Sequence, residues 1–109
     1  MQSQDSQEII KRFFIAIDEL KKRKVIRGLQ TFSNRYGANR WNMVTQRKQP
    51  QRDMFQVAWL AYLVNDYGVS ALWLLTGKGP MFDPGESELR QELRRIAAKY
   101  LSGEDDTNK

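Results

Sequence analysis

The chain has 109 residues, with 18 Lys or Arg against 13 Asp or Glu and a formal net charge of +5 at pH 7. This length predicts one domain, and 40% hydrophobic with 28% charged residues is typical of a globular protein. The chain has no cysteine and no histidine, which excludes disulfides, thiol nucleophiles, imidazole bases and the usual zinc ligands.

The positive charge lies in the first half of the chain. Residues 1–48 hold 11 Lys or Arg and 4 Asp or Glu, residues 49–80 hold 2 and 2, and residues 81–109 hold 5 and 7. A basic surface on a small protein is the electrostatic footprint expected of binding to a phosphate backbone. The apolar run at 13–17 is too short for a signal peptide or a membrane span, so we expect a cytoplasmic protein.

The first predicted helix covers residues 6–24. Apolar residues recur there at three- and four-residue spacing, and Asp5 with Glu8 forms a candidate N-cap and capping box. Four consecutive basic residues, 21–24, fall in its last turn. A helix dipole favours positive charge at that end, and this interpretation weighs at least as much as contact with DNA.

Two short helices follow, over residues 29–36 and from Asn39 to about Arg47. Gly37 can end the first of them in the left-handed conformation, and Asn39 is a good N-cap for the second. Met43 is the expected core residue of the later helix. The polar segment 49–53 then predicts a loop.

Residues 55–66 are apolar nearly all round, which predicts a central buried helix containing Trp59. Gly68 ends this helix, and Ser70 caps a last short helix over residues 71–76, where Trp73 is also expected in the core. The glycines and prolines of residues 77–85 then close the domain.

A further amphipathic helix is predicted over residues 87–101, followed by a polar, acidic tail. Its apolar stripe is about two heptads long, which is short for a coiled coil. The stripe either docks on the domain or pairs two copies of the chain. It consists of Leu89, Leu93, Ile96 and Tyr100. We therefore predict an all-α protein with a five-helix domain in residues 1–82 and a linker, helix and tail in residues 83–109.

Segment 29–48 has the features that a helix-turn-helix requires. Ser33 is small where the two helices would touch, and Gly37 tolerates positive φ in the turn. Phe32, Tyr36 and Met43 supply the apolar anchors. The pattern alone is moderately specific, because packed helices joined by glycine occur in many bundles.

A second stretch, residues 67–79, contains a Gly-Val-Ser turn that leads into a Trp-Leu-Leu-Thr-Gly helix end. With this stretch, residues 5–82 resemble the lambda-repressor-like (Cro/repressor, XRE-type) DNA-binding family. The resemblance implies a compact five-helix domain whose third helix lies in the major groove, with dimers bound to paired half-sites. It also implies a sequence-specific transcriptional regulator, most simply a repressor.

The resemblance also implies which residues bind DNA. Arg40 is the best candidate for a bidentate contact with guanine, Asn42 could read adenine, and Thr45 could meet a thymine methyl. The start and outer face of the recognition helix are then formed by Asn39, Arg40, Trp41, Asn42 and Thr45, and the residues suited to phosphate contacts are Gln30, Arg47 and Lys48. A plain N-cap is the favoured interpretation of Asn39, and a solvated helix end explains Arg47 and Lys48 equally well.

Three positions depart from the family pattern. Leu29 replaces a glutamine that braces the backbone contact, so that role is either lost or moved to Gln30. Gln46 replaces an apolar residue, which predicts a looser C-terminal half of the third helix. Trp41 is larger than the usual serine or glycine, so we expect it to be exposed. It would stack on a sugar or a thymine methyl, or pack on a neighbouring helix or a partner protein.

The expected partners are double-stranded DNA and a second copy of the chain. Dimerisation would use the last helix of the domain, through Leu72 and Trp73, or the C-terminal stripe. No catalytic constellation, metal site, cofactor or small-molecule effector emerges from the sequence, so we do not expect an enzyme. The alternative is a protein-interaction module on the same fold, an antitoxin or an adaptor, with weak and purely salt-driven binding to DNA.

Overall fold

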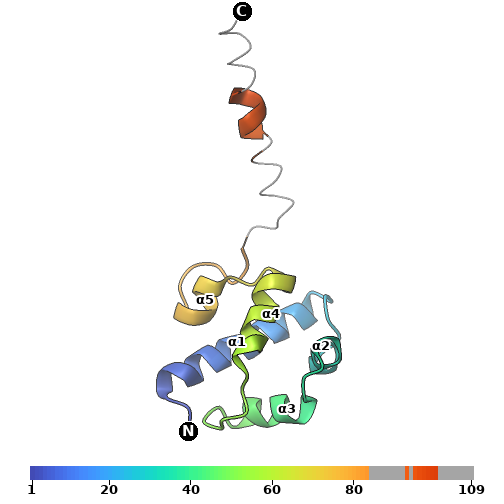
Figure 1. Ribbon diagram of the computed structural model, residues 1–109, viewed down its shortest axis with the longest axis vertical. Helices are drawn as coiled ribbons and strands as arrows, with labels where there is room; N and C mark the ends of the chain where they lie inside the picture. Colours follow the sequence, from blue (N-terminus) through green and yellow to red (C-terminus); the bar gives the residue numbers. More distant parts are fainter. Residues whose placement is uncertain (84–92, 94, 101–109) are drawn as a thin grey trace, which may run out of the picture.

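The computed structural model describes residues 1–83, 93 and 95–100, and helices dominate all of these ranges (Figure 1). The described residues contain an isolated antiparallel bridge between Val69 and Phe82 and no longer strand, so the class is all-α. No helix in them is long and apolar enough to cross a membrane. The helices of residues 1–83 are α1 (Gln4–Lys22), α2 (Leu29–Tyr36), α3 (Arg40–Lys48), α4 (Val57–Tyr67) and α5 (Ala71–Thr76).

Helix α1 begins before the predicted start, so the expected N-cap at Asp5 is wrong. The cap is Ser3, whose side chain accepts a hydrogen bond from the backbone N–H of Ser6 at 3.2 Å. The earlier start leaves Asp5 inside the first turn, where its carboxylate faces the positive end of the helix dipole. Ser3 and Asp5 can both cap this end, and the start after Ser3 adds two residues to the helix while it keeps the favourable carboxylate of Asp5 in the first turn.

The C-terminal end of α1 is a Schellman motif closed by a lysine. The N–H of Val25 donates to the carbonyl of Leu20 at 2.9 Å, and the N–H of Lys24 donates to that of Lys21 at 3.0 Å. Lys24 adopts the left-handed conformation with φ of +63°, at the position where helices usually carry glycine. The side chain of Lys24 therefore sits on a strained backbone.

The remaining helix boundaries agree closely with prediction. Asn39 accepts a hydrogen bond from the N–H of Asn42 at 3.1 Å, and Ser70 accepts one from the N–H of Trp73 at 3.2 Å. Gly37 ends α2 in the left-handed conformation, as predicted. Helix α4 starts at Val57 rather than at residue 55.

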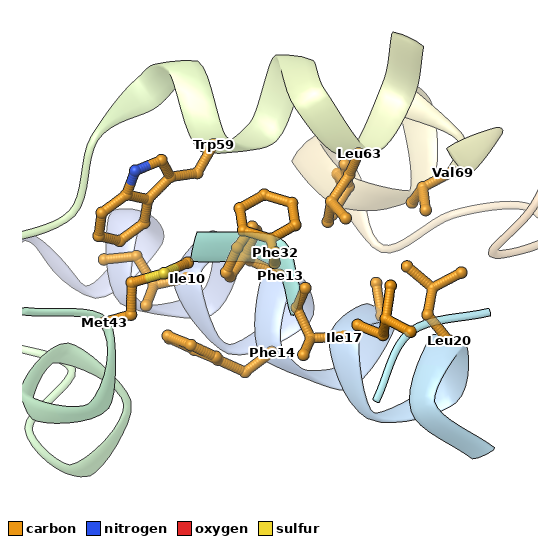
Figure 2. Close-up of a cluster of buried hydrophobic side chains, with 13 residues drawn as sticks. Ile10, Phe13, Phe14, Ile17, Leu20, Phe32, Met43, Trp59, Leu63 and Val69 are labelled. Carbon is orange, nitrogen blue, oxygen red and sulfur yellow. The ribbon is translucent and has the colours of Figure 1, made fainter. Parts of the chain in front are cut away.

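The core is built on α1 and not on α4 (Figure 2). Phe13 is fully buried, and its ring meets those of Phe32 and Phe55 edge to face, with centroids 5.6 and 5.2 Å away. Trp59 and Leu63 point from α4 toward this centre. The buried apolar residues of α1 are Ile10, Phe13, Phe14, Ala16, Ile17 and Leu20.

The predicted central burial of residues 55–66 is therefore wrong. Helix α4 buries Trp59 and Leu63 fully and leaves Val57 78% exposed. The longest helix, α1, occupies the centre, and α4 covers it from one side only (Figure 1). The predicted burial of Trp59 is confirmed, whereas Trp73 on α5 is only half-buried.

A charged side chain joins α1 to α5. Arg12 donates from Nε to the carbonyl of Leu74 at 2.7 Å and from Nη2 to that of Leu75 at 3.2 Å. These carbonyls lie at the C-terminal end of α5, where the helix leaves them without partners and a positive charge is favourable. Arg12 thus holds α5 against α1.

The C-terminal stripe is described only in part. Leu89 lies outside the described residues. Leu93, Ile96 and Tyr100 are exposed, so docking of these three side chains on the domain is not observed. Residues 95–100 are helical, as predicted for this part of the chain.

We expect Lys24→Gly to raise the free energy of unfolding by about 1 kcal/mol, because glycine adopts the left-handed conformation without steric cost. Urea denaturation followed by circular dichroism measures the change. The matched control is Lys22→Gly in the last turn of α1, which should lower stability by about 1 kcal/mol. A loss of stability in both variants would show that the backbone at Lys24 is not strained.

Candidate nucleic-acid interface

Helices α2 and α3 pack against each other through the short turn at residues 37–39. Ser33 is buried at their contact, and its hydroxyl donates to the carbonyl of Gln30 at 3.2 Å. The N–H of Ala38 donates to the carbonyl of Ser33 at 2.9 Å and closes the turn. Phe32 and Met43 are fully buried, as their predicted anchoring role requires. The start of α3 is thereby fixed relative to α2.

The outer face of α3 presents cationic and apolar side chains to solvent. Arg40 and Lys48 are exposed, and neither forms a hydrogen bond or an ion pair within the described part of the chain. Trp41 is 66% exposed, which confirms the predicted exposure. Asn42 and Thr45 are partly exposed. A free guanidinium, an indole and a terminal ammonium thus lie along one short helix.

Two polar residues at the start of the unit have local roles. The side chain of Asn39 caps α3, as the favoured interpretation predicted. Gln30 is exposed, and its Oε1 lies above the start of α2, 3.1 Å from where a Cβ on Gly28 would stand. Contacts of Asn39 with a base and of Gln30 with a phosphate stay predictions.

Arg47 ties α3 to α1. Its Nη1 donates to Oδ1 of Asp18 at 2.9 Å and its Nη2 to Oδ2 at 2.5 Å, while the guanidinium lies 5.6 Å from the centre of the Phe14 ring. Because the guanidinium and the carboxylate are planar and share two hydrogen bonds, the contact fixes the orientation of the two side chains as well as their separation. The charge of Arg47 is therefore balanced by a carboxylate, in contrast to the free charges of Arg40 and Lys48.

Gln46 organises the chain that follows α3. Its side chain is fully buried, donates from Nε2 to the carbonyl of Pro50 at 2.9 Å, and accepts from the N–H of Met54 at 2.8 Å. The predicted loosening of the C-terminal half of α3 is therefore wrong. An amide satisfied at both ends substitutes for the apolar residue and closes the 49–54 loop.

A groove of about 260 Å³ lies between α1 and the starts of α2 and α3. The residue before α2 is Gly28, which offers no side chain to the free N–H groups at the start of the helix. The polar lining of the groove comprises Asp18, Lys21, Arg27, Gln30, Arg40 and Arg47. Helix amides and unbalanced cations in one concave site favour a bound anion.

Sequence reasoning did not identify Arg27 as a site residue, and for Lys21 it weighed a helix-end role at least as highly as contact with DNA. Both line the groove. A local signal was present for Arg27, because it directly precedes Gly28 at the start of α2. No local signal existed for Lys21, which reaches the groove only through the packing of α1 against the other helices.

The end of α2 is held against α4 by an aromatic and acidic cluster. The hydroxyl of Tyr36 donates to Oδ2 of Asp66 at 2.5 Å, and its ring stacks on Tyr62 with centroids 4.0 Å apart. Burial raises the pKa of Tyr36, and the hydrogen bond to Asp66 raises it further. The phenol therefore stays protonated and keeps donating over the physiological pH range.

These contacts place the free cations of α3, the exposed Trp41 and the groove at the start of α2 on neighbouring parts of the surface. No protein-family model, curated protein or solved structure that was compared with the chain matches it. We therefore infer function from the chemistry of this surface.

We expect Gln46→Leu to lower the free energy of unfolding by about 2 kcal/mol, because it leaves the carbonyl of Pro50 and the N–H of Met54 without their partner. Urea denaturation gives the difference from the unsubstituted protein. Gln49→Ala, at an exposed position beside the same loop, should change stability by less than about 0.5 kcal/mol. Equal or greater stability of Gln46→Leu would mean that the leucine packs as the family pattern implies.

Proposed function

We propose that the protein is a sequence-specific DNA-binding transcriptional regulator of the lambda-repressor-like (Cro/repressor, XRE-type) helix-turn-helix class. In this proposal it acts as a dimer and represses transcription by occluding a promoter. One observation carries the proposal. The exposed start of α3, with the free guanidinium of Arg40, adjoins the cationic groove at the start of α2.

Base readout would come from α3 in the major groove. Arg40 can donate two parallel hydrogen bonds to O6 and N7 of guanine, since no protein group occupies its guanidinium in the described structure. Asn42, partly exposed, suits adenine, and Thr45 suits a thymine methyl. These contacts specify sequence only if α3 is held in a fixed register on the duplex.

Phosphate contacts would hold that register. The start of α2 faces a groove lined by Lys21 and Arg27, where a backbone phosphate would meet helix amides and two unbalanced cations. Lys48 supplies a further cation at the other end of α3. Two phosphate sites at opposite ends of α3 would fix both its depth and its angle in the groove.

Dimerisation would use the face formed by α4 and α5, which carries little charge. Residues 54–77 contain a single charged residue, Asp66, and Leu72 and Leu75 on α5 are 58% and 53% exposed. In a two-fold interface the same patch meets itself, so an uncharged apolar patch avoids repulsion between like charges. The half-buried Trp73 lies between these leucines in sequence, and the exposed Leu93, Ile96 and Tyr100 offer a second possible contact.

The second candidate is a protein-interaction module on the same fold. The exposed Trp41 favours it, because tryptophan is common among residues that anchor protein interfaces. This candidate requires binding to DNA that is weak, independent of sequence and lost as salt is raised.

Selection of bound duplexes from a random pool at about 0.15 M salt separates the two candidates, because non-specific binding is weak at that concentration. Enrichment of an inverted repeat with half-sites about 10 bp apart supports the dimeric regulator. No enrichment, with protein shown to be folded by circular dichroism, contradicts it and favours the interaction module.

We expect Arg40→Ala to weaken binding to the selected site by about 1–3 kcal/mol and to relax preference at one base position. Lys48→Ala should weaken binding to all sequences alike and reduce the dependence of affinity on salt. Fluorescence anisotropy with selected and random duplexes measures both effects. An equal loss on selected and random DNA after Arg40→Ala would contradict base readout by this residue.

We expect Leu72→Glu to convert the dimer into monomers, because it places like charges opposite each other in the interface. Affinity for the inverted repeat should fall by about 100-fold while affinity for an isolated half-site stays unchanged. Sedimentation equilibrium checks the oligomeric state. Ile15→Glu, exposed on α1, is the control for an added surface charge. Monomers formed by Ile96→Glu and not by Leu72→Glu would assign the interface to the C-terminal stripe.

A further inference from the structure

Trp41 is an apolar side chain on an otherwise polar surface. Between Val25 and Val57 it is the only large hydrophobic residue that the structure leaves exposed. Its indole makes no hydrogen bond with the described residues and no contact with another aromatic ring among them. A single exposed apolar side chain is common on protein surfaces, so the chemistry around Trp41 has to show what it binds.

The neighbours of Trp41 define the chemistry of that ligand. Thr45 lies one turn further along α3 and is partly exposed, so its methyl group extends the apolar spot. Arg40 and Lys48 flank this spot with free positive charges. The ligand must therefore be anionic overall and must present a small apolar group to the start of α3.

Double-stranded DNA meets both conditions at thymine. The C5 methyl group of thymine is the apolar feature that a base pair displays in the major groove, and phosphates lie on either side of it. An acidic protein surface would satisfy the positive charges equally, but Arg40 shares the groove at the start of α2 with Lys21 and Arg27, where helix amides favour a phosphate.

We propose that Trp41 is a specificity-determining residue that recognises thymine through its C5 methyl group, with Thr45 completing the apolar contact. This inference rests on the proposed function. Recognition of this kind needs no hydrogen bond to the base, so it discriminates thymine from uracil, which lacks the methyl group. Removal of one methyl from a covered apolar contact weakens binding about fourfold.

The test uses the site obtained by selection and replaces each thymine in turn by deoxyuridine. Unsubstituted protein should lose about fourfold in affinity at one thymine position in each half-site. Trp41→Ala should bind the thymine duplex more weakly and lose the discrimination between thymine and uracil at that position. Trp41→Phe should keep the discrimination, because the phenyl ring remains apolar. Trp41 is exposed, so all variants should retain the circular dichroism of the unsubstituted protein.

Lys48→Ala is the matched control on the same helix. It should bind thymine and uracil duplexes more weakly by the same factor, which leaves their ratio unchanged. An unchanged ratio in Trp41→Ala, or a selected site whose affinity no thymine-to-uracil change alters, would overturn the inference while leaving sequence-specific binding intact. Failure to select any site would overturn the proposed function and this inference together.

Discussion

The fold depends on the burial of one face of α1. Phe13, at the centre of that face, is fully buried and has aromatic contacts with α2, with α4 and with the segment before α4. Helices α2 to α5 have 6 to 11 residues and are too short to be stable alone, so packing against the apolar face of α1 supplies their stability. The start of α3 can face solvent with free cations because Met43 anchors its other side in this core.

Polar contacts then set the orientation of the helices on this centre. The Arg47 contact with Asp18 joins α3 to α1, the Tyr36 contact with Asp66 joins α2 to α4, and Arg12 joins α5 to α1. Apolar packing is non-directional, whereas each of these contacts restricts an angle. If α3 binds a duplex as proposed, the angle between α2 and α3 matters as much as the stability of the fold. Of the five side chains in these contacts, only Arg47 lies on α3.

Local sequence signals predicted the parts of the structure that depend on neighbouring residues. Asn39, Ser70 and Gly37 act within one turn of their own positions, so their roles were predictable. The start of α1 was mispredicted because Ser3 and Asp5 can both cap it. The exposure of α4 was mispredicted because hydropathy does not reveal which face of a helix its neighbours cover. The candidate site residues on α3 were predicted from a family resemblance, whereas the pairing of Arg47 with Asp18 joins residues too far apart for a local signal.

The distribution of charge links the two halves of the proposed function. The net charge of +5 is not spread over the chain, because residues 54–77 carry only Asp66. In the proposed complex, the cations of α1, α2 and α3 raise the local concentration of a polyanion, and the α4–α5 surface, which carries only Asp66, limits the repulsion between two positively charged copies. Attraction between charges does not depend on the base sequence of the DNA. Specificity in this arrangement therefore depends on the α3 side chains that form no polar contact within the described structure, Arg40 and Trp41 above all.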